Sequence, residues 1–179
     1  LGATVGWNNG LGQNFWLVAA SHRSSHPRRE SAVVVFDVRS GGAPQLIETG
    51  PEGIGALCTA DVDGDGDLDL FIGGTPRFGR YPEPARSQIW INEGGILKYS
   101  ASWSDAFNEL GMVRGATFYE VDGDGSPDLA LALQWGPIRV FRNTGNRFQE
   151  ITHELGLDAS PGLWTGIASG DFDGDGRLD

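Results

Sequence analysis

The chain has 179 residues, of which 24 are acidic and 13 basic, and a formal net charge of −11. This length suits one ordinary domain with a sizeable core, and the acidic balance argues against a general affinity for nucleic acid or for anionic membranes. No run of 18 or more apolar residues occurs, so no membrane span is expected, and the single cysteine, Cys58, cannot form an internal disulfide.

The first 50 residues predict four short strands in succession. Apolar and β-branched runs alternate with stretches rich in Gly, Asn, Ser and Pro, a pattern typical of antiparallel strands and their turns. The strands are expected over residues 2–7, 15–20, 31–37 and 45–48. The stretch between the first two strands contains no carboxylate, so no metal site is expected there.

The same order of strands recurs twice more, and in both copies an acidic loop follows the first strand. The first strands are expected to start near Gly55 and Gly115, and the turns 92–95 and 143–146 predict hairpins because Gly and Asn adopt positive φ at little cost. The later strands are expected over residues 68–73, 88–92 and 96–100, and then over residues 128–134, 138–142 and 147–152.

Four-stranded units repeated every 50 to 60 residues with glycine-rich turns predict an all-β fold of β-propeller blades. The expected blades cover residues 1–50, 51–110 and 111–160, and residues 161–179 begin a further blade. A closed propeller has about four to eight blades. We therefore expect an incomplete ring, which sequence beyond this chain or another copy would complete.

The acidic residues are concentrated in three loops that begin at residues 61, 120 and 171 and follow the pattern D-x-D-G-D-G-x-x-D, with Glu120 in place of the first Asp of the second loop. Calcium takes about six to eight oxygen ligands, so carboxylates at alternate positions of a tight loop can converge on one ion. We expect side-chain ligands at positions 1, 3, 5 and 9 and a backbone carbonyl at position 7. The candidate ligands are Asp61, Asp63, Asp65, Asp67 and Asp69; Glu120, Asp122, Asp124, Ser126 and Asp128; and Asp171, Asp173, Asp175, Arg177 and Asp179.

The spacing of the acids separates these loops from EF-hands and from plain turns. An EF-hand loop has 12 residues, closes with Glu and lies between helices, whereas these loops close at position 9 and run into apolar strands. An ordinary solvated Asp-Gly turn could account for one loop. In three loops with at least four converging acids each, the carboxylates of a loop would repel one another without a cation. The sequence therefore predicts up to three Ca²⁺ sites.

The loops and the strand Leu-Phe-Ile-Gly-Gly at 70–74 resemble FG-GAP repeats, also called VCBS repeats, of the integrin α-subunit propeller type. The segments 147–157 and 164–176 are similar to large secreted bacterial proteins of this group that often end in an ASPIC/UnbV segment. The resemblance implies a calcium-stabilised propeller outside the cytoplasm, secreted or at the cell surface, with cell adhesion or partner binding as its role. The literal Phe-Gly and Gly-Ala-Pro ends are missing, so integrin-like ligand binding does not carry over.

Connections in an antiparallel blade alternate between two ends, so the acidic loops are expected at one face and the second-to-third connections at the other. Two long Arg-rich connections, 21–30 and 75–86, would lie on that other face, where solvated loops are the simpler interpretation. Our hypothesis is recognition of a protein or an acidic polysaccharide by Arg28, Arg29, Arg77, Arg80 and Tyr81.

A catalytic role is the alternative to binding, because some polysaccharide lyases are propellers that contain calcium. No nucleophile motif such as G-x-S-x-G occurs, and no base–acid pair stands out beside the loops. A binding module without catalytic activity is therefore favoured over a fragment of a calcium-dependent lyase. The six tryptophans fall mostly on or beside strands, which favours packing between blades over stacking on sugars.

Overall fold

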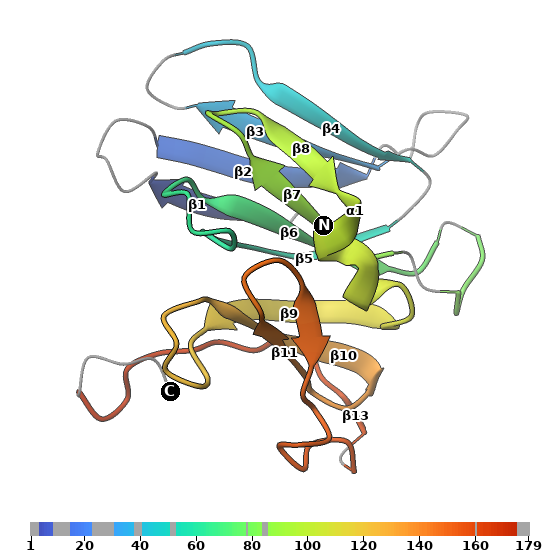
Figure 1. Ribbon diagram of the computed structural model, residues 1–179. Coiled ribbons are helices and arrows are strands. Elements are labelled where there is room, and N and C mark those ends of the chain that lie inside the picture. Colours follow the sequence, from blue (N-terminus) through green and yellow to red (C-terminus); the bar gives the residue numbers. More distant parts are fainter. Residues whose placement is uncertain are drawn as a thin grey trace.

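The computed structural model describes the backbone of residues 4–8, 15–22, 31–37, 41–50, 53–77, 79–83, 86–159 and 161–174. Side chains are described for residues 32–36 and 41–49 and for the later ranges. Three antiparallel sheets lie in layers, each built from strands that follow one another along the chain (Figure 1). The prediction of an all-β fold with four-stranded units is confirmed, and no closed ring is present in the described residues.

The first sheet comprises the first four strands of the chain in the order β1-β2-β3-β4. Alternate residues of β3 point toward the second sheet, where Val33 and Val35 are buried together with Ile47 of β4. The strands are β1 (Thr4–Asn8), β2 (Phe15–His22), β3 (Ser31–Asp37) and β4 (Gln45–Gly50).

The second sheet repeats this order, and every residue of its strand β6 is buried. Its side chains pack on one side against the first sheet and on the other against the third sheet. The strands are β5 (Gly53–Ala60), β6 (Asp69–Thr75), β7 (Gln88–Asn92) and β8 (Leu97–Ser100).

The third sheet has the same four antiparallel strands and one short addition, β13, which pairs with the far end of β10 through Gln134 and Leu163. The added strand comes from the segment in which the sequence predicts the start of a further unit. The strands are β9 (Met112–Tyr119), β10 (Asp128–Gly136), β11 (Arg139–Asn143), β12 (Phe148–Glu150) and β13 (Gly162–Leu163).

A short helical segment that the sequence did not predict joins the second and third sheets. It consists of α1 (Ala101–Ser104) and the 3-10 turn η1 (Asp105–Phe107). Four helical residues are too few to produce a recognisable 3.6-residue period. The segment brings Phe107 between the sheets, where its ring lies 5.5 Å from that of Phe71 and 5.1 Å from that of Phe141.

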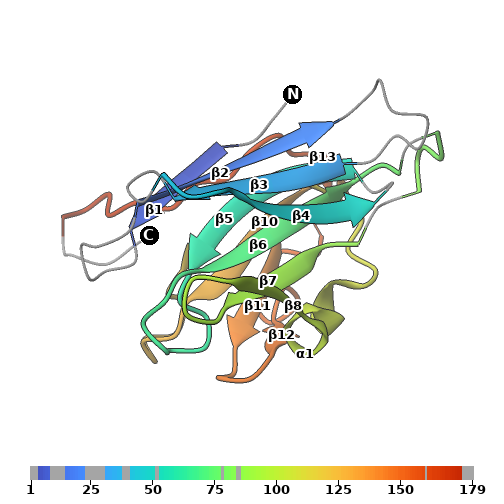
Figure 2. The same cartoon turned by 90° about the horizontal axis from the view of Figure 1, so that it is seen from above.

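Glycines allow the second and third sheets to approach closely. A Cβ atom on Gly55 would lie 2.2 Å from the carbonyl oxygen of Val113, and one on Gly73 would lie 2.8 Å from the Val113 side chain. No side chain fits at those distances, so these positions need glycine for packing and not for a turn. The view from above shows the sheets lying over one another (Figure 2).

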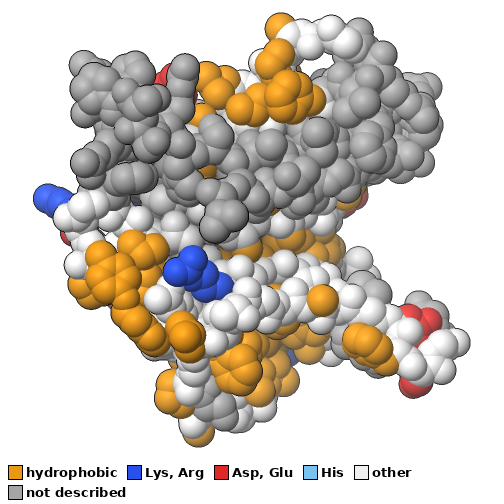
Figure 3. Space-filling model, turned by 180° about the vertical axis from the view of Figure 1, so that it is seen from behind, with side chains coloured by type: hydrophobic (Ala, Val, Ile, Leu, Met, Phe, Trp, Pro, Cys, Tyr) orange, Lys and Arg blue, Asp and Glu red, His pale blue; other side chains and the backbone are white. Residues whose placement is uncertain are grey.

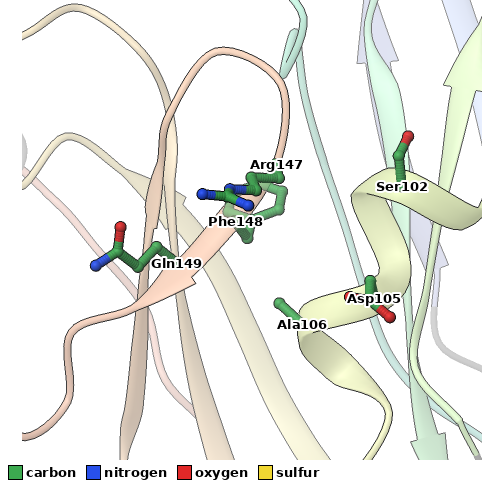
Figure 4. Close-up of a pocket in the computed structure, with 6 residues that line it drawn as sticks. All are labelled: Ser102, Asp105, Ala106, Arg147, Phe148 and Gln149. Atoms are coloured by element: carbon green, nitrogen blue, oxygen red, sulfur yellow. The ribbon is translucent and has the colours of Figure 1, made fainter.

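A small hollow of about 190 Å³ opens between the helical segment and β12. Ser102, Asp105 and Ala106 line it on the side of the helical segment, and Arg147, Phe148 and Gln149 line it on the side of β12 (Figure 4). The floor is closed by Phe148, whose ring contacts those of Trp103 and Phe107. This hollow is therefore part of the packing between two blades.

Within the described residues, no helix has the length and apolar character needed to cross a lipid bilayer.

Candidate metal sites

The first acidic loop connects β5 to β6, where Ala60 and Asp69 form the last pair of the strand ladder. Oxygen atoms of Asp61, Asp63 and Asp65 all lie within 4.8 Å of one another. The chain turns sharply at Gly64 and Gly66, whose φ angles are 79° and 95°. Such angles are strained for other residues, which explains the glycines of the repeat pattern.

Backbone N–H groups hold the three carboxylates together. The Asp61 carboxylate accepts hydrogen bonds from Gly64 N at 2.8 Å, Asp65 N at 3.1 Å and Gly66 N at 2.9 Å, so the loop folds around its own first residue. Asp63 Oδ1 accepts from Asp65 N and Asp65 Oδ1 accepts from Asp67 N. Each of the three carboxylates thus accepts at least one hydrogen bond from the backbone of its own loop.

The second loop connects β9 to β10 and has the same arrangement. Oxygen atoms of Glu120, Asp122 and Asp124 lie within 4.8 Å of one another. The longer Glu120 side chain takes the place of Asp61, since it accepts hydrogen bonds from Asp122 N, Gly123 N and Gly125 N. The replacement of Asp by Glu at this position is therefore accommodated by the loop.

The donor set fits a hard divalent cation. Calcium–oxygen distances are about 2.3–2.6 Å, so oxygens on opposite sides of one ion lie about 4.6–5.2 Å apart. Three carboxylate oxygens within 4.8 Å of one another satisfy this limit in each loop. Both loops therefore have an arrangement of side chains that could hold a divalent cation.

The closing carboxylates Asp69 and Asp128 are buried at the base of the loops. Asp69 accepts hydrogen bonds from Val62 N and from Asn92 N, both at 2.8 Å. Asp128 accepts from Val121 N at 2.9 Å and from Asn143 N at 2.7 Å. Each carboxylate thus joins its acidic loop to the third strand of the same sheet, a role that the sequence did not predict, and its role as a metal ligand stays a prediction.

Burial makes the ionised form of these carboxylates costly. Burial, together with the smaller effect of the neighbouring carboxylates of Asp63 and Asp65, raises the pKa of Asp69 to about 7 against the opposing effect of its two backbone hydrogen bonds. Burial likewise raises the pKa of Asp128. A cation beside either carboxylate would favour the ionised form.

The second loop differs from the first by a neighbouring arginine. Arg142 Nε lies 2.7 Å from Asp122 Oδ2, and Arg142 Nη1 lies 3.9 Å from Glu154 Oε2. Arg142 precedes Asn143 in the third sheet, and the equivalent residue before Asn92 in the second sheet is the uncharged Ile91. One carboxylate of the second loop is therefore partly neutralised by the protein itself.

The third loop is described only over its first four residues. Gly174 N donates to Asp171 Oδ1 at 2.7 Å, which repeats the bond from Gly64 N to Asp61 in the first loop. Asp173 is also described, whereas Asp175, Arg177 and Asp179 lie outside the described residues. The carbonyl ligands expected at position 7 stay predictions.

The opposite face carries an exposed aromatic pair. Tyr81 of the β6–β7 connection and Trp135 at the end of β10 form an edge-to-face contact with ring centroids 5.5 Å apart, and each is 57 % exposed. Hydrophobic side chains gather where these connections lie, and a group of acidic side chains lies at the opposite edge (Figure 3). The expected core packing is thus wrong for Trp135 and for the exposed Trp164, whereas Trp103 is buried as expected.

The candidate arginines of this face are engaged by an acid. Arg77 Nη1 lies 2.9 Å from Glu83 Oε1, and Arg80 Nη1 lies 3.3 Å from Glu83 Oε2. These pairs lower the pKa of the Glu83 carboxyl below its usual value. Arg28 and Arg29 lie outside the described residues. Trp135 was not predicted from the sequence as a residue of this face. A tryptophan directly before Gly-Pro at the end of a strand is nevertheless a usable signal for an exposed hairpin residue.

Comparisons with known proteins give consistent results for the acidic repeats. The model of the FG-GAP-like repeat matches residues 61–131 and 120–179. Integrin alpha-4 from Xenopus laevis is 30% identical over 117 residues, which are 59% of this chain and only 11% of that protein. The solved structure of a Xanthomonas type IV secretion system related protein aligns with a TM-score of 0.43 and 15% identity over 84% of this chain and 85% of that chain. The ASPIC/UnbV resemblance stays a prediction.

Proposed function

Because this chain belongs to the FG-GAP-like repeat family, we propose that it is a calcium-stabilised part of a β-propeller that acts as an extracellular or cell-surface binding and adhesion module. The observation that carries the proposal is the convergence of three carboxylates in each of two equivalent loops. Both loops connect the first two strands of a blade, so an ion bound there would fix the junction of those strands.

Calcium would act by neutralising the loops. Without a cation, carboxylates within 4.8 Å repel one another and the buried closing carboxylate resists ionisation. Extracellular modules bind Ca²⁺ with Kd values of roughly 10⁻⁴ to 10⁻³ M. Sites of that affinity would be filled in calcium-rich surroundings outside the cell, which supports the proposed localisation together with the likeness to an integrin α-subunit.

Calcium titration of the full chain tests this proposal, with thermal unfolding as the measurement. At [Ca²⁺] about 100 times Kd, one filled site adds about 2.7 kcal/mol of stability. For a chain of this size that corresponds to roughly 5 to 10 °C in Tm. The variant Asp63→Asn with Asp65→Asn should lose the contribution of one loop, whereas the exposed Glu109→Gln, which also removes a negative charge, should keep it. No calcium-dependent rise in Tm would contradict the proposal.

We further propose that the face with Tyr81 and Trp135 recognises the partner, a protein or an acidic polysaccharide. Glu83 already pairs with Arg77 and Arg80, so the exposed rings supply most of the attraction in the described part of this face. The rest of the ring, from a longer protein or from another copy, would complete the scaffold.

Binding arrays of acidic glycans and cell-surface proteins test this second proposal. Tyr81→Ala with Trp135→Ala should weaken binding more than Arg77→Ala with Arg80→Ala. Equal binding by the unmodified chain and by both double variants would contradict the assignment of this face. Cleavage of any acidic glycan by the purified chain would contradict a function in binding alone.

A further inference from the structure

A continuous chain of buried hydrogen bonds joins the two acidic loops. Val62 N donates to Asp69 Oδ2 at 2.8 Å within the first loop. The carbonyl oxygen of the same residue, Val62, accepts a hydrogen bond at 2.8 Å from Asn143 Nδ2 in the third sheet. Asn143 N in turn donates to Asp128 Oδ1 at 2.7 Å. The closing carboxylates of the two loops are therefore connected through two residues.

This connection is stiff because its members are buried. Asp128 is 0 % exposed, Asp69 and Asn143 are each 1 % exposed, and Val62 is 2 % exposed. A buried polar group that loses its partner also lacks water to replace it, so these bonds break only at substantial cost. The Val62 side chain also packs in the core cluster that contains Phe141 of the third sheet. The first loop consequently cannot change its shape at Val62 without disturbing the third sheet.

The equivalent asparagine of the second sheet makes no such link among the described residues. Asn92 N donates to Asp69 as Asn143 N donates to Asp128, and both side-chain oxygens accept a hydrogen bond at 2.8 Å from the following turn. The difference lies in the amide nitrogen. Asn92 Nδ2 donates to Leu68 O of its own loop at 3.2 Å, whereas Asn143 Nδ2 reaches the neighbouring loop.

We propose that Asn143 is a positioning residue that couples cation binding in the two loops, so that filling the 120–128 loop raises the affinity of the 61–69 loop. This inference rests on the proposed calcium sites. A cation in the second loop would fix Asp128 and with it Asn143, and the Val62 peptide would then be held in place between Asp61 and Asp63. Coupling between sites is reciprocal and amounts to about 5- to 150-fold in typical cases, and we expect about tenfold.

Both loops also face one cleft of about 430 Å³, lined among others by Asp61, Asp63, Ser126 and Gly145. Two cations on the walls of one cleft repel each other, which acts against the proposed coupling. That repulsion does not depend on the side chain at position 143. Substitution of Asn143 therefore separates the two effects.

NMR titration of the full chain with Ca²⁺ tests the coupling, because Gly66 and Gly125 amides report on the two loops separately. All proteins carry Asp171→Asn and Asp173→Asn, so that the third loop does not contribute. The second loop is then silenced by Asp122→Asn with Asp124→Asn, which should weaken the first loop about tenfold. In Asn92→Ala, the same silencing should still weaken the Ca²⁺ affinity of the first loop about tenfold, although this variant also loses the hydrogen bond from its following turn. In Asn143→Ala, the silencing should weaken that affinity less than about twofold.

The outcomes distinguish the coupling from the calcium sites themselves. If neither glycine amide responds to Ca²⁺, the proposed function is wrong. If both loops bind but silencing the second leaves the first unchanged, or if Asn143→Ala retains the full effect, the coupling is overturned and the calcium sites stand.

A second measurement retains Asn143 and so does not depend on the folding of Asn143→Ala. With the first loop silenced by Asp63→Asn and Asp65→Asn, Ca²⁺ binding to the second loop should shift the Val62 amide and the Asn143 side-chain amide. A Val62 amide that stays unchanged while Gly125 responds would overturn the proposal.

Discussion

Replacement of Arg142 by methionine should strengthen calcium binding in the second loop and should lower the thermal stability of the calcium-free protein. Arg142 Nε lies 2.7 Å from Asp122 Oδ2, and a calcium ion bound to this carboxylate would lie about 2.3–2.6 Å from its oxygens. The guanidinium and the ion would then be about 5 Å apart. Removing the positive charge therefore removes a repulsion between two cations.

The size of the effect follows from Coulomb's law. Charges of +2 and +1 at about 5 Å in water repel by about 1.7 kcal/mol. Both side chains are only about one-third exposed, so the dielectric of water gives a lower limit, which salt at physiological concentration reduces to about 1 kcal/mol. We therefore expect Kd of the second loop to fall at least about fivefold. The Tm of the calcium-free protein should fall, because Asp122 loses the positive charge that offsets its repulsion from the other carboxylates of the loop.

Calorimetric or NMR titration with Ca²⁺ measures the first effect, and thermal unfolding in chelator measures the second. Arg139→Met is the matched control, since Arg139 lies on the same strand and pairs with Glu150 at 2.9 Å, outside the acidic loops. An unchanged or weaker affinity in Arg142→Met, with Arg139→Met unaffected, would refute the electrostatic mechanism.

Three further predictions concern packing and titration. Phe107→Ala should destabilise the chain by about 3–5 kcal/mol, with a smaller loss for Phe107→Leu, because this ring fills the space between two sheets; denaturant unfolding measures both. Gly55→Ala should cost about 1–3 kcal/mol in the same assay because its Cβ would meet a backbone oxygen at 2.2 Å, whereas Gly166→Ala, with nothing within 4 Å, should be tolerated. The hydrogen bond from His153 Nδ1 to Asp158 at 2.6 Å raises the pKa of His153. This pair therefore stabilises the folded state slightly at a pH below the unfolded-state pKa of His153, and the stabilisation is lost as the pH rises through the folded-state pKa. Asp158→Asn should bring the pKa of His153, measured by NMR titration, back toward its ordinary value, and an unchanged titration would refute the assignment.

Much of the fold could be predicted because strands, turns and loops are local features. Apolar runs such as 68–73 and turns with Asn and Gly such as 143–146 specify a strand or a hairpin from a few adjacent residues, and the described strands lie close to the expected ranges. The positions of the converging carboxylates follow in the same way, because the spacing of Asp61, Asp63 and Asp65 within a tight loop places them on one side.

The remaining features depend on contacts between distant residues. The bond from Asn143 to Val62 joins positions 81 residues apart, and no local pattern distinguishes Asn143 from Asn92. The burial of Asp69 depends on the third strand of its sheet, which contributes the N–H of Asn92. The ring contact of Trp135 with Tyr81 joins positions 54 residues apart, in the third sheet and in a connection of the second, and no local pattern predicts it.

The bond from Asn143 to Val62 also sets an order for folding during synthesis. Val62 leaves the ribosome 81 residues before the side chain that satisfies its carbonyl oxygen. At about 5–20 residues per second, the first acidic loop waits roughly 4 to 16 seconds for this partner. The second sheet is therefore completed only after most of the third sheet has been synthesised.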